Sequence, residues 1–128
     1  SKDNIIFTGH SLGGACVSIL AYLVHLYYPS KHLDVITYGS PKHMTLYNNG
    51  NDNLIFTHYL NQSDPVIEKP MNVPYSRVPD CVYFNKDTGN DNINHSLKVY
   101  NPKTRDRCRK RYHRFDELIV RFLLDLLG

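Results

Sequence analysis

The sequence has few cysteines and no apolar run long enough to span a membrane. Its three cysteines, Cys16, Cys81 and Cys108, show no CxxC spacing, so they predict neither a disulfide framework nor a zinc site. No apolar stretch reaches the length of a membrane span, and residues 1–4 resemble neither a signal peptide nor a transit peptide. The spacing of His, Cys and Asp supports no metal site, and no cofactor is expected.

The composition is that of an ordinary globular protein, with 41% hydrophobic and 21% charged residues. A length of 128 residues allows one domain with a core, but it is short for a complete α/β enzyme. The chain has no initiator Met, and a strand-like segment begins almost at once. We therefore expect residues 1–128 to form a single domain that was cut from a longer protein.

Short β-rich runs alternate with loops and one long apolar run. Four runs are predicted strands: residues 4–8, 34–38, 53–60 and 81–84. Turn-forming residues predict loops at 48–53, 61–65, 69–79 and 85–94. The long apolar run, residues 16–28, ends at Pro29 and predicts a helix that is covered on most sides, with Cys16 buried in it. A last apolar helix is expected at residues 115–127, packed against the body of the domain.

The order of these elements predicts an α/β fold, a mostly parallel sheet with helical cover. Right-handed crossovers place successive strand ends at the same edge of such a sheet, where open α/β sheets bind their ligands. Ser11 follows the first strand, Asp64 the third, and His95 comes soon after the fourth. The three residues can therefore converge at that edge.

Ser11 stands in the motif G-x-S-x-G, between a predicted strand and a predicted helix. A serine on such a sharp turn is held out above the sheet edge, and we expect Gly9 and Gly13 to remove side chains that would collide across the turn. The N–H of Leu12, at the start of the helix, would point toward a forming oxyanion. The alternative is a glycine-rich helix start that happens to contain a serine.

A serine nucleophile needs a base, which is itself oriented by an acid. Asp64 lies on the turn after a strand, and Pro65 stiffens that turn. The chain order Ser, Asp, His is that of an α/β-hydrolase, so Asp64 is the expected acid. The alternative is an aspartate that only caps its own turn.

Two histidines follow Asp64 and are candidates for the base. His95 lies in a loop after the last strand, whereas His113 lies among arginines that would disfavour the protonated imidazole required in catalysis. His95 is therefore the expected base, with a surface loop histidine as the alternative. The remaining histidines are expected to be structural or solvated: His10, His25, His32, His43 and His58.

Four segments resemble the class 3, or fungal-type, lipase family of α/β-hydrolases. They are IIFTGHSLGGA at residues 5–15, TYGSP at 37–41, NQSDPV at 61–66 and HSLKVY at 95–100. In that family the first segment holds the nucleophile, the D-P-V turn supplies the acid, and a late His near an aromatic residue supplies the base. The resemblance implies a serine-dependent hydrolase of lipid esters, with Ser11, Asp64 and His95 as its catalytic residues and Leu12 as an oxyanion donor.

The resemblance covers only the C-terminal half of the family pattern. Several strands, a lid helix and the second oxyanion donor precede the nucleophile in the family, and Lys42-His43 departs from its usual sequence. Losing one oxyanion donor typically costs about 10²–10³ in rate, which leaves a chain that is inactive on its own as an alternative to an active enzyme. The strand at residues 4–8 would lack a neighbour on one side, so we expect the chain to self-associate or to be poorly soluble alone. Its missing half would restore the neighbour and keep the protein in solution.

Two further hypotheses compete with an ester hydrolase. The first is a truncated, non-catalytic relative that serves as an interaction module. The second rests on the basic stretch at residues 103–114, which could bind an anionic membrane surface. Only Tyr112 and Phe115 accompany these basic residues as aromatics, so nucleic acid is not an expected partner.

Overall fold

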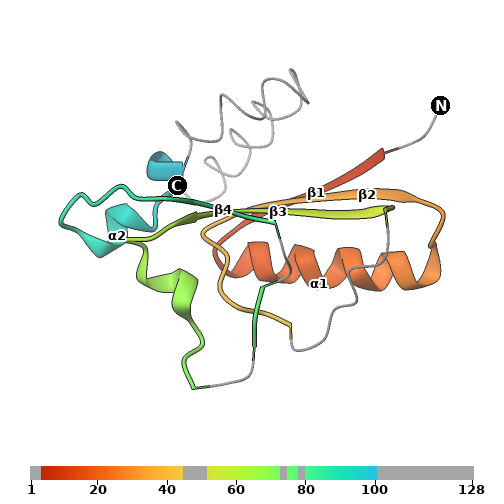
Figure 1. Cartoon of the computed structure of the whole chain (residues 1–128), viewed down its shortest axis with the longest axis horizontal. Helices are drawn as coiled ribbons and strands as arrows, with labels where there is room; N and C mark the ends of the chain where they lie inside the picture. The colour runs from red at the N-terminus through yellow and green to blue at the C-terminus, as the bar shows by residue number, and fades with distance from the viewer. Residues whose placement is uncertain (1–3, 45–51, 73–74, 78–79, 101–128) are drawn as a thin grey trace.

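The computed structural model describes residues 4–44, 52–72, 75–77 and 80–100. Its strands are β1 (Asn4–His10), β2 (His32–Tyr38), β3 (Leu54–Asn61) and β4 (Cys81–Phe84), and its helices are α1 (Leu12–Tyr27), the 3-10 helix η1 (Pro65–Glu68) and α2 (Asp91–Asn94). The strands lie side by side in chain order, and every neighbouring pair is parallel (Figure 1). The predicted α/β fold, a parallel sheet with helical cover, is confirmed.

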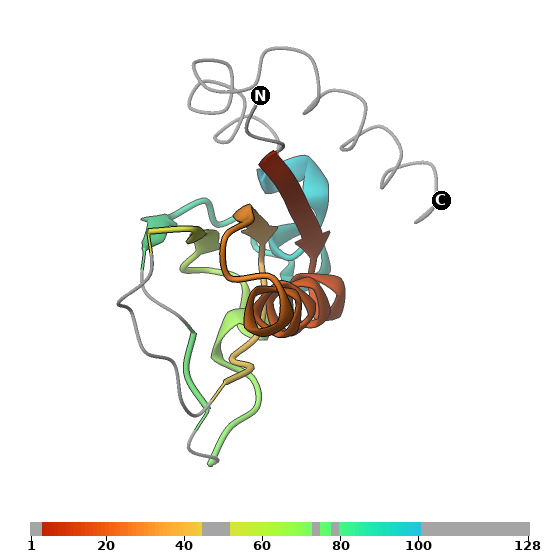
Figure 2. The same ribbon diagram turned by 90° about the vertical axis from the view of Figure 1, so that its right-hand side faces the viewer.

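The interior strand β2 is buried on both faces from Leu33 to Tyr38, although the polar residues Asp34 and Thr37 interrupt its apolar sequence. One face packs against α1, which crosses β1, β2 and β3 and is seen end-on in Figure 2. The core on that face consists of Ala21, Leu33, Val35, Leu54 and Phe56. The core on the other face consists of Ile36, Tyr38, Tyr59, Leu97 and Tyr100. The helical residues 97–100 thus cover the face opposite α1.

Most predicted elements are present, with shifted boundaries. β1 reaches His10 because its parallel pairing with β2 continues to Tyr38. Residues 91–94, predicted as loop, form α2 because the side chain of Asn90 caps the N–H groups of Asn92 and Ile93. The basic stretch at 103–114 and the predicted helix at 115–127 lie outside the described residues.

The helix predicted at residues 16–28 begins at Leu12 instead, and the expectation that it is covered on most sides is wrong. Small residues face the sheet, where they allow close packing: Gly14, Ala15, Ser18 and Ala21 are buried. Val17, Tyr22 and Val24 flank these small residues and pack partly against the core. Six other large apolar side chains point away from the sheet and are exposed: Leu12, Ile19, Leu20, Leu23, Leu26 and Tyr27. Cys16 lies on this exposed face, so its predicted burial is also wrong.

β1 forms one edge of the sheet. Within the described residues it pairs only with β2, and Ile5 is exposed there. Across residues 4–44, 52–72, 75–77 and 80–100, the structure contains no helix with the length and apolar character needed to cross a bilayer.

Candidate active site

Ser11 occupies the sharp turn between β1 and α1. Its backbone has φ 55° and ψ −131°, a conformation that a residue other than glycine rarely adopts. The Ser11 N–H donates to the carbonyl of Tyr38 at 3.0 Å, and the Ser11 carbonyl accepts from the N–H of Gly14 at 2.9 Å. The turn is therefore fixed both to the end of β2 and to the first turn of α1.

The glycines around Ser11 have different roles. A Cβ at Gly9 would lie 2.5 Å from the carbonyl carbon and oxygen of Gly13, a distance that backbone atoms cannot relieve cheaply. A Cβ at Gly14 would lie 2.9 Å from Cβ of Ser40, so this glycine allows α1 to approach the sheet. A Cβ at Gly13 would meet nothing within 4 Å. The expectation that Gly13 removes a collision is wrong, because it is the backbone of Gly13 that needs the space at Gly9.

Asp64 follows β3 and caps η1, and its side chain is almost completely buried. Its Oδ1 accepts from the N–H of Val66 at 2.9 Å. Its Oδ2 accepts from Nδ1 of His95 at 2.8 Å and from the hydroxyl of Tyr100 at 2.6 Å. Asp64 thus caps its own turn, as the simpler alternative supposed, and also contacts His95.

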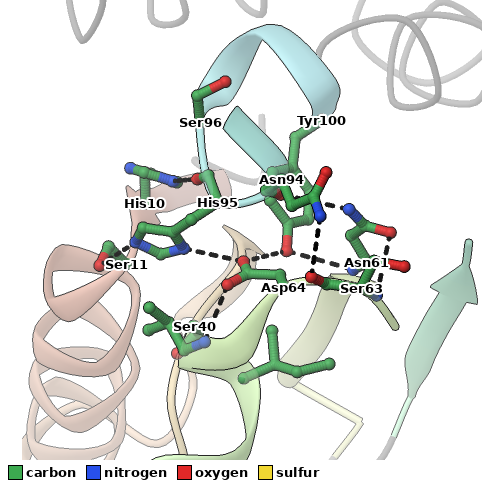
Figure 3. A network of polar contacts seen from close by, with 12 residues as sticks. His10, Ser11, Ser40, Asn61, Ser63, Asp64, Asn94, His95, Ser96 and Tyr100 are labelled. Carbon is green, nitrogen blue, oxygen red and sulfur yellow. Dashed lines mark hydrogen bonds and ion pairs between the residues drawn. The ribbon is translucent and has the colours of Figure 1, made fainter. Parts of the chain in front are cut away.

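His95 is the C-cap residue of α2, and its imidazole lies between Ser11 and Asp64 (Figure 3). Its Nδ1 lies 2.8 Å from Oδ2 of Asp64, and its Nε2 lies 2.7 Å from Oγ of Ser11. Since a carboxylate only accepts, Nδ1 carries the proton of the first bond, and Nε2 accepts from the serine hydroxyl. The structure brings the three predicted residues together; the other candidate base, His113, lies outside the described residues.

Tyr100 closes the site on the side of Asp64. Its ring is fully buried, and its hydroxyl accepts from the N–H of Asn61 at 3.1 Å while donating to Asp64. Burial, followed by the hydrogen bond to Asp64, raises the pKa of Tyr100 above its usual value. The phenol therefore stays protonated and remains a donor to the carboxylate. Gly39, at φ +58°, leaves room for both, because a Cβ there would lie 2.8 Å from Oδ2 of Asp64.

His10 is a residue of the site whose contact sequence reasoning missed. Its Nε2 donates to the carbonyl of His95 at 2.6 Å, and the two rings lie 4.7 Å apart between centroids. Burial lowers the pKa of His10, which keeps this imidazole neutral. The sequence offered one signal, its position directly before Ser11, but the partner lies 85 residues away in the chain.

A second group of imidazoles lies deeper, on the α1 face of the sheet. His58 is fully buried, its Nδ1 lies 2.6 Å from Oγ1 of Thr37, and its ring meets the edge of His43. Burial, with smaller contributions from His43 and Arg77, lowers the pKa of His58 to about 3. His58 is therefore neutral in the folded protein at ordinary pH, in agreement with the structural role predicted for it.

Leu12, the predicted oxyanion donor, is the first residue of α1. The first N–H groups of a helix have no carbonyl partner within it, so this N–H is free to meet an anion beside Ser11. Within the part of the chain that the structure describes, no group of three or more His, Cys, Asp or Glu side chains could hold a metal ion. The chemistry available at this site is that of a hydroxyl, an imidazole and a carboxylate in contact.

Comparison with known families agrees with this geometry. The family described as Lipase (class 3) matches residues 1–73, more than half of the 128-residue chain. The match contains Ser11 and Asp64 in the positions that the structure brings together, and it ends before His95. A search of curated proteins found no match. On the strength of the family match, the chain belongs to the class 3 lipase family.

Proposed function

We propose that this chain supplies the catalytic residues of a serine-dependent carboxylic-ester hydrolase, and that it is the C-terminal portion of an α/β-hydrolase. The observation that carries the proposal is the unbroken contact from Ser11 Oγ to His95 Nε2, at 2.7 Å, and from His95 Nδ1 to Asp64 Oδ2, at 2.8 Å. These distances match those at which a base can take a proton from a nucleophile and an acid can orient the base.

The contacts support a direction for each proton transfer in the proposed reaction. Ser11 Oγ attacks the ester carbonyl while its proton passes to Nε2 of His95, which then returns a proton to the leaving alkoxide. Asp64 keeps Nδ1 protonated, so that Nε2 is the free acceptor, and stabilises the imidazolium that forms. Water then repeats the same steps on the acyl-serine, with His95 again as base, and releases the carboxylic acid.

The oxyanion that forms in each step needs hydrogen-bond donors. The N–H of Leu12 is adjacent to the nucleophile and lies at the positive end of α1, which makes it one donor. An oxyanion site commonly has two donors, and each is worth about 10²–10³ in rate. By the resemblance to the class 3 lipase family, the second donor would come from a segment that precedes the nucleophile.

The substrate class follows from the family and from the surface beside the nucleophile. Class 3 lipases act on lipid esters, and Leu12, next to Ser11, exposes 69% of its surface. An exposed apolar side chain at the nucleophile suits the acyl chain of a lipid better than it suits a charged substrate. We therefore assign lipid-like esters as substrates.

Covalent labelling tests the nucleophile. A fluorophosphonate probe should modify Ser11, and Ser11→Ala should abolish labelling and lower kcat for a p-nitrophenyl ester by about a millionfold. Ser30→Ala is the matched control, since Ser30 is an exposed serine in the turn between α1 and β2. Labelling elsewhere, or turnover that survives Ser11→Ala, would contradict the proposal.

The same experiment separates an enzyme from a non-catalytic relative. If the chain is a truncated interaction module, neither labelling nor turnover should occur, even when the upstream half of the family pattern is supplied in the same polypeptide. If the chain is an incomplete enzyme, labelling of Ser11 should appear or increase by about 10²-fold or more when that half restores the second donor.

A further inference from the structure

Two buried asparagines lie beside the proposed acid and base. Asn61 is the last residue of β3, shortly before Asp64, and Asn94 is the last residue of α2, directly before His95. Asn61 exposes 0% of its surface and Asn94 2%. Asparagine is seldom buried to this extent, and a buried amide is tolerated only where its polar atoms are hydrogen-bonded.

The two asparagines donate hydrogen bonds in opposite directions between the segment of the acid and the segment of the base (Figure 3). Nδ2 of Asn61 donates to the carbonyl of Asn94 at 3.2 Å, which belongs to the peptide group that leads into His95. Nδ2 of Asn94 donates to the carbonyl of Ser63 at 3.2 Å, which belongs to the peptide group that leads into Asp64. The two amides therefore form a reciprocal clasp between the segment of the acid and the segment of the base.

The clasp also includes the loop after β4. Nδ2 of Asn61 donates to the carbonyl of Lys86 at 2.9 Å, and Oδ1 of Asn61 accepts from the N–H of Lys86 at 2.8 Å. Oδ1 of Asn94 accepts from the N–H and the hydroxyl of Thr88, at 2.9 and 2.7 Å, and its Nδ2 donates to Asp87 at 3.1 Å.

Both amides use their whole hydrogen-bonding capacity. Oδ1 of Asn61 also accepts from the N–H of Ser63, at 3.4 Å, so each amide has two donated and two accepted bonds. A primary amide can make no more than this. A network in which every polar group is satisfied defines a single arrangement of the segments that it joins.

We propose that Asn61 and Asn94 are positioning residues, which hold Asp64 and His95 in register with each other. The inference rests on the proposed function, because it assigns the clasp to the acid and base of that reaction. Neither asparagine touches Ser11 or the imidazole of His95; they act through the two peptide groups. The residue type follows from the geometry, since only an amide both donates two hydrogen bonds and accepts two at this length.

Substitution by aspartate tests the clasp with almost no change of shape. Asn94→Asp removes the donor to Ser63 and places a carboxylate oxygen against that carbonyl, and Asn61→Asp does the same toward Asn94. Each should lower kcat for a p-nitrophenyl ester by about 10- to 100-fold, because a small misplacement of the base is costly, while KM changes less than about twofold. Asn90→Asp is the control with the same charge change; its side chain is exposed and still caps α2.

A second measurement is independent of turnover. The Nδ1 proton of His95, held by Asp64 at 2.8 Å, should give a downfield NMR resonance in the wild type. This resonance should move upfield or broaden in Asn61→Asp and Asn94→Asp and stay in place in Asn90→Asp. If the resonance changes as expected in a protein without esterase activity, the clasp stands and the proposed function fails. If the variants keep both resonance and kcat, the clasp is wrong and the function stands.

A second substitution that compensates for the first distinguishes a loss of positioning from simple unfolding of the variant. Asp87→Asn combined with Asn94→Asp preserves the contact between residues 87 and 94 with its donor reversed and removes the donation to Ser63; it also takes the acceptor from the exposed N–H of Gly89, which bonds to the same oxygen of Asp87. This double variant should fold, by circular dichroism, and still show the loss of kcat. If it unfolds as Asn94→Asp does, or folds with the kcat of the wild type, the positioning role is overturned.

Discussion

The two halves of the site are built in different ways. The nucleophile half, from β1 through Ser11 into α1, is specified by backbone geometry within a few residues: Gly9 makes room for Gly13, and Ser11 bonds to Tyr38. The acid–base half, residues 61–64 and 94–100, is specified by side chains that contact one another across about thirty residues of sequence. Steric demands fix the first half, and hydrogen bonds fix the second.

This difference predicts two kinds of sensitivity. A sterically fixed turn should fail abruptly, since a backbone collision at 2.5 Å has no cheap relief. A hydrogen-bonded network should lose activity in steps, because each bond contributes about 1 kcal/mol and a bond to a charged group about twice that. Substitutions can test each half separately, and pH tests the buried imidazole of His58 in the sheet next to them.

The largest effect is expected at Gly9. Gly9→Ala should destabilise the protein by about 3 kcal/mol or more and remove activity, because its Cβ would overlap the backbone of Gly13. Gly13→Ala is the contrasting variant, since a Cβ there meets nothing within 4 Å and alanine favours a helix by up to about 1 kcal/mol. Urea unfolding of both measures the difference; equal midpoints would show that the turn adapts and is not sterically fixed.

Acid should destabilise the protein through His58, which lies on β3 and belongs to neither half of the site. The pKa of this imidazole is about 3 in the folded protein against 6.5 in a model peptide, so the unfolded state binds more protons between these values. Stability should therefore fall as pH drops below about 6.5, reaching a loss of about 2 kcal/mol near pH 5. His43, whose pKa is also lowered by burial, acts in the same direction.

His58→Gln measures the contribution of His58 to this acid sensitivity. Glutamine keeps a polar side chain beside Thr37 but does not titrate in this range, so the slope of unfolding free energy against pH should become shallower between pH 5 and pH 6.5. The absolute stability at pH 7 is not the readout. Parallel slopes for wild type and variant would show that other groups cause the acid sensitivity.

A moderate effect is expected in the acid–base half from Tyr100→Phe. The variant loses the donor to Asp64 and leaves the N–H of Asn61 without its acceptor, which should cost about 1–2 kcal/mol of stability. We expect kcat to fall roughly tenfold, because two hydrogen bonds still hold the carboxylate of Asp64. A loss as complete as that of Ser11→Ala would mean that the network fails abruptly, like the turn.

The smallest effect concerns the edge of β1 and does not involve the site. Among the described residues, the outer edge of β1 has no partner strand and Ile5 is exposed, which invites pairing with another chain; we therefore expect the 128-residue chain to self-associate. Ile5→Lys should raise the protein concentration required for association about tenfold, as measured by sedimentation velocity. The substitution should leave the environment of Ser11 unchanged. A wild-type protein that stays monomeric at high concentration would contradict this.

The sequence predicted the fold class and the contact among Ser11, Asp64 and His95 because local patterns carry both. Buried parallel strands are rich in apolar residues, and a G-x-S-x-G motif between a strand and a helix defines a sharp turn. The contact follows from chain order, since parallel strands bring their ends to one edge. The positions of these side chains could therefore be derived from residue spacing; their catalytic roles stay a prediction.

The remaining features depend on contacts that no local pattern records. Nothing near Asn94 indicates that its amide bonds to Ser63, and nothing near His10 indicates the carbonyl of His95. The sequence did not show which face of α1 packs on the sheet, for a related reason. Both faces of the helix are apolar, and only packing shows that the small residues face the sheet and Leu23 faces away. Tertiary structure decided each of these points.

The burial of Asn61 and Asn94 has a consequence for glycan attachment. Each asparagine stands two residues before a serine, with a residue other than proline between, which is the acceptor sequence for N-linked sugars. In the folded protein both Nδ2 atoms are buried and donate two hydrogen bonds each, so no transferase can reach them. A sugar at either position would have to be added before this region folds, and its bulk would then keep the clasp from closing. For these two residues, folding and glycosylation exclude each other.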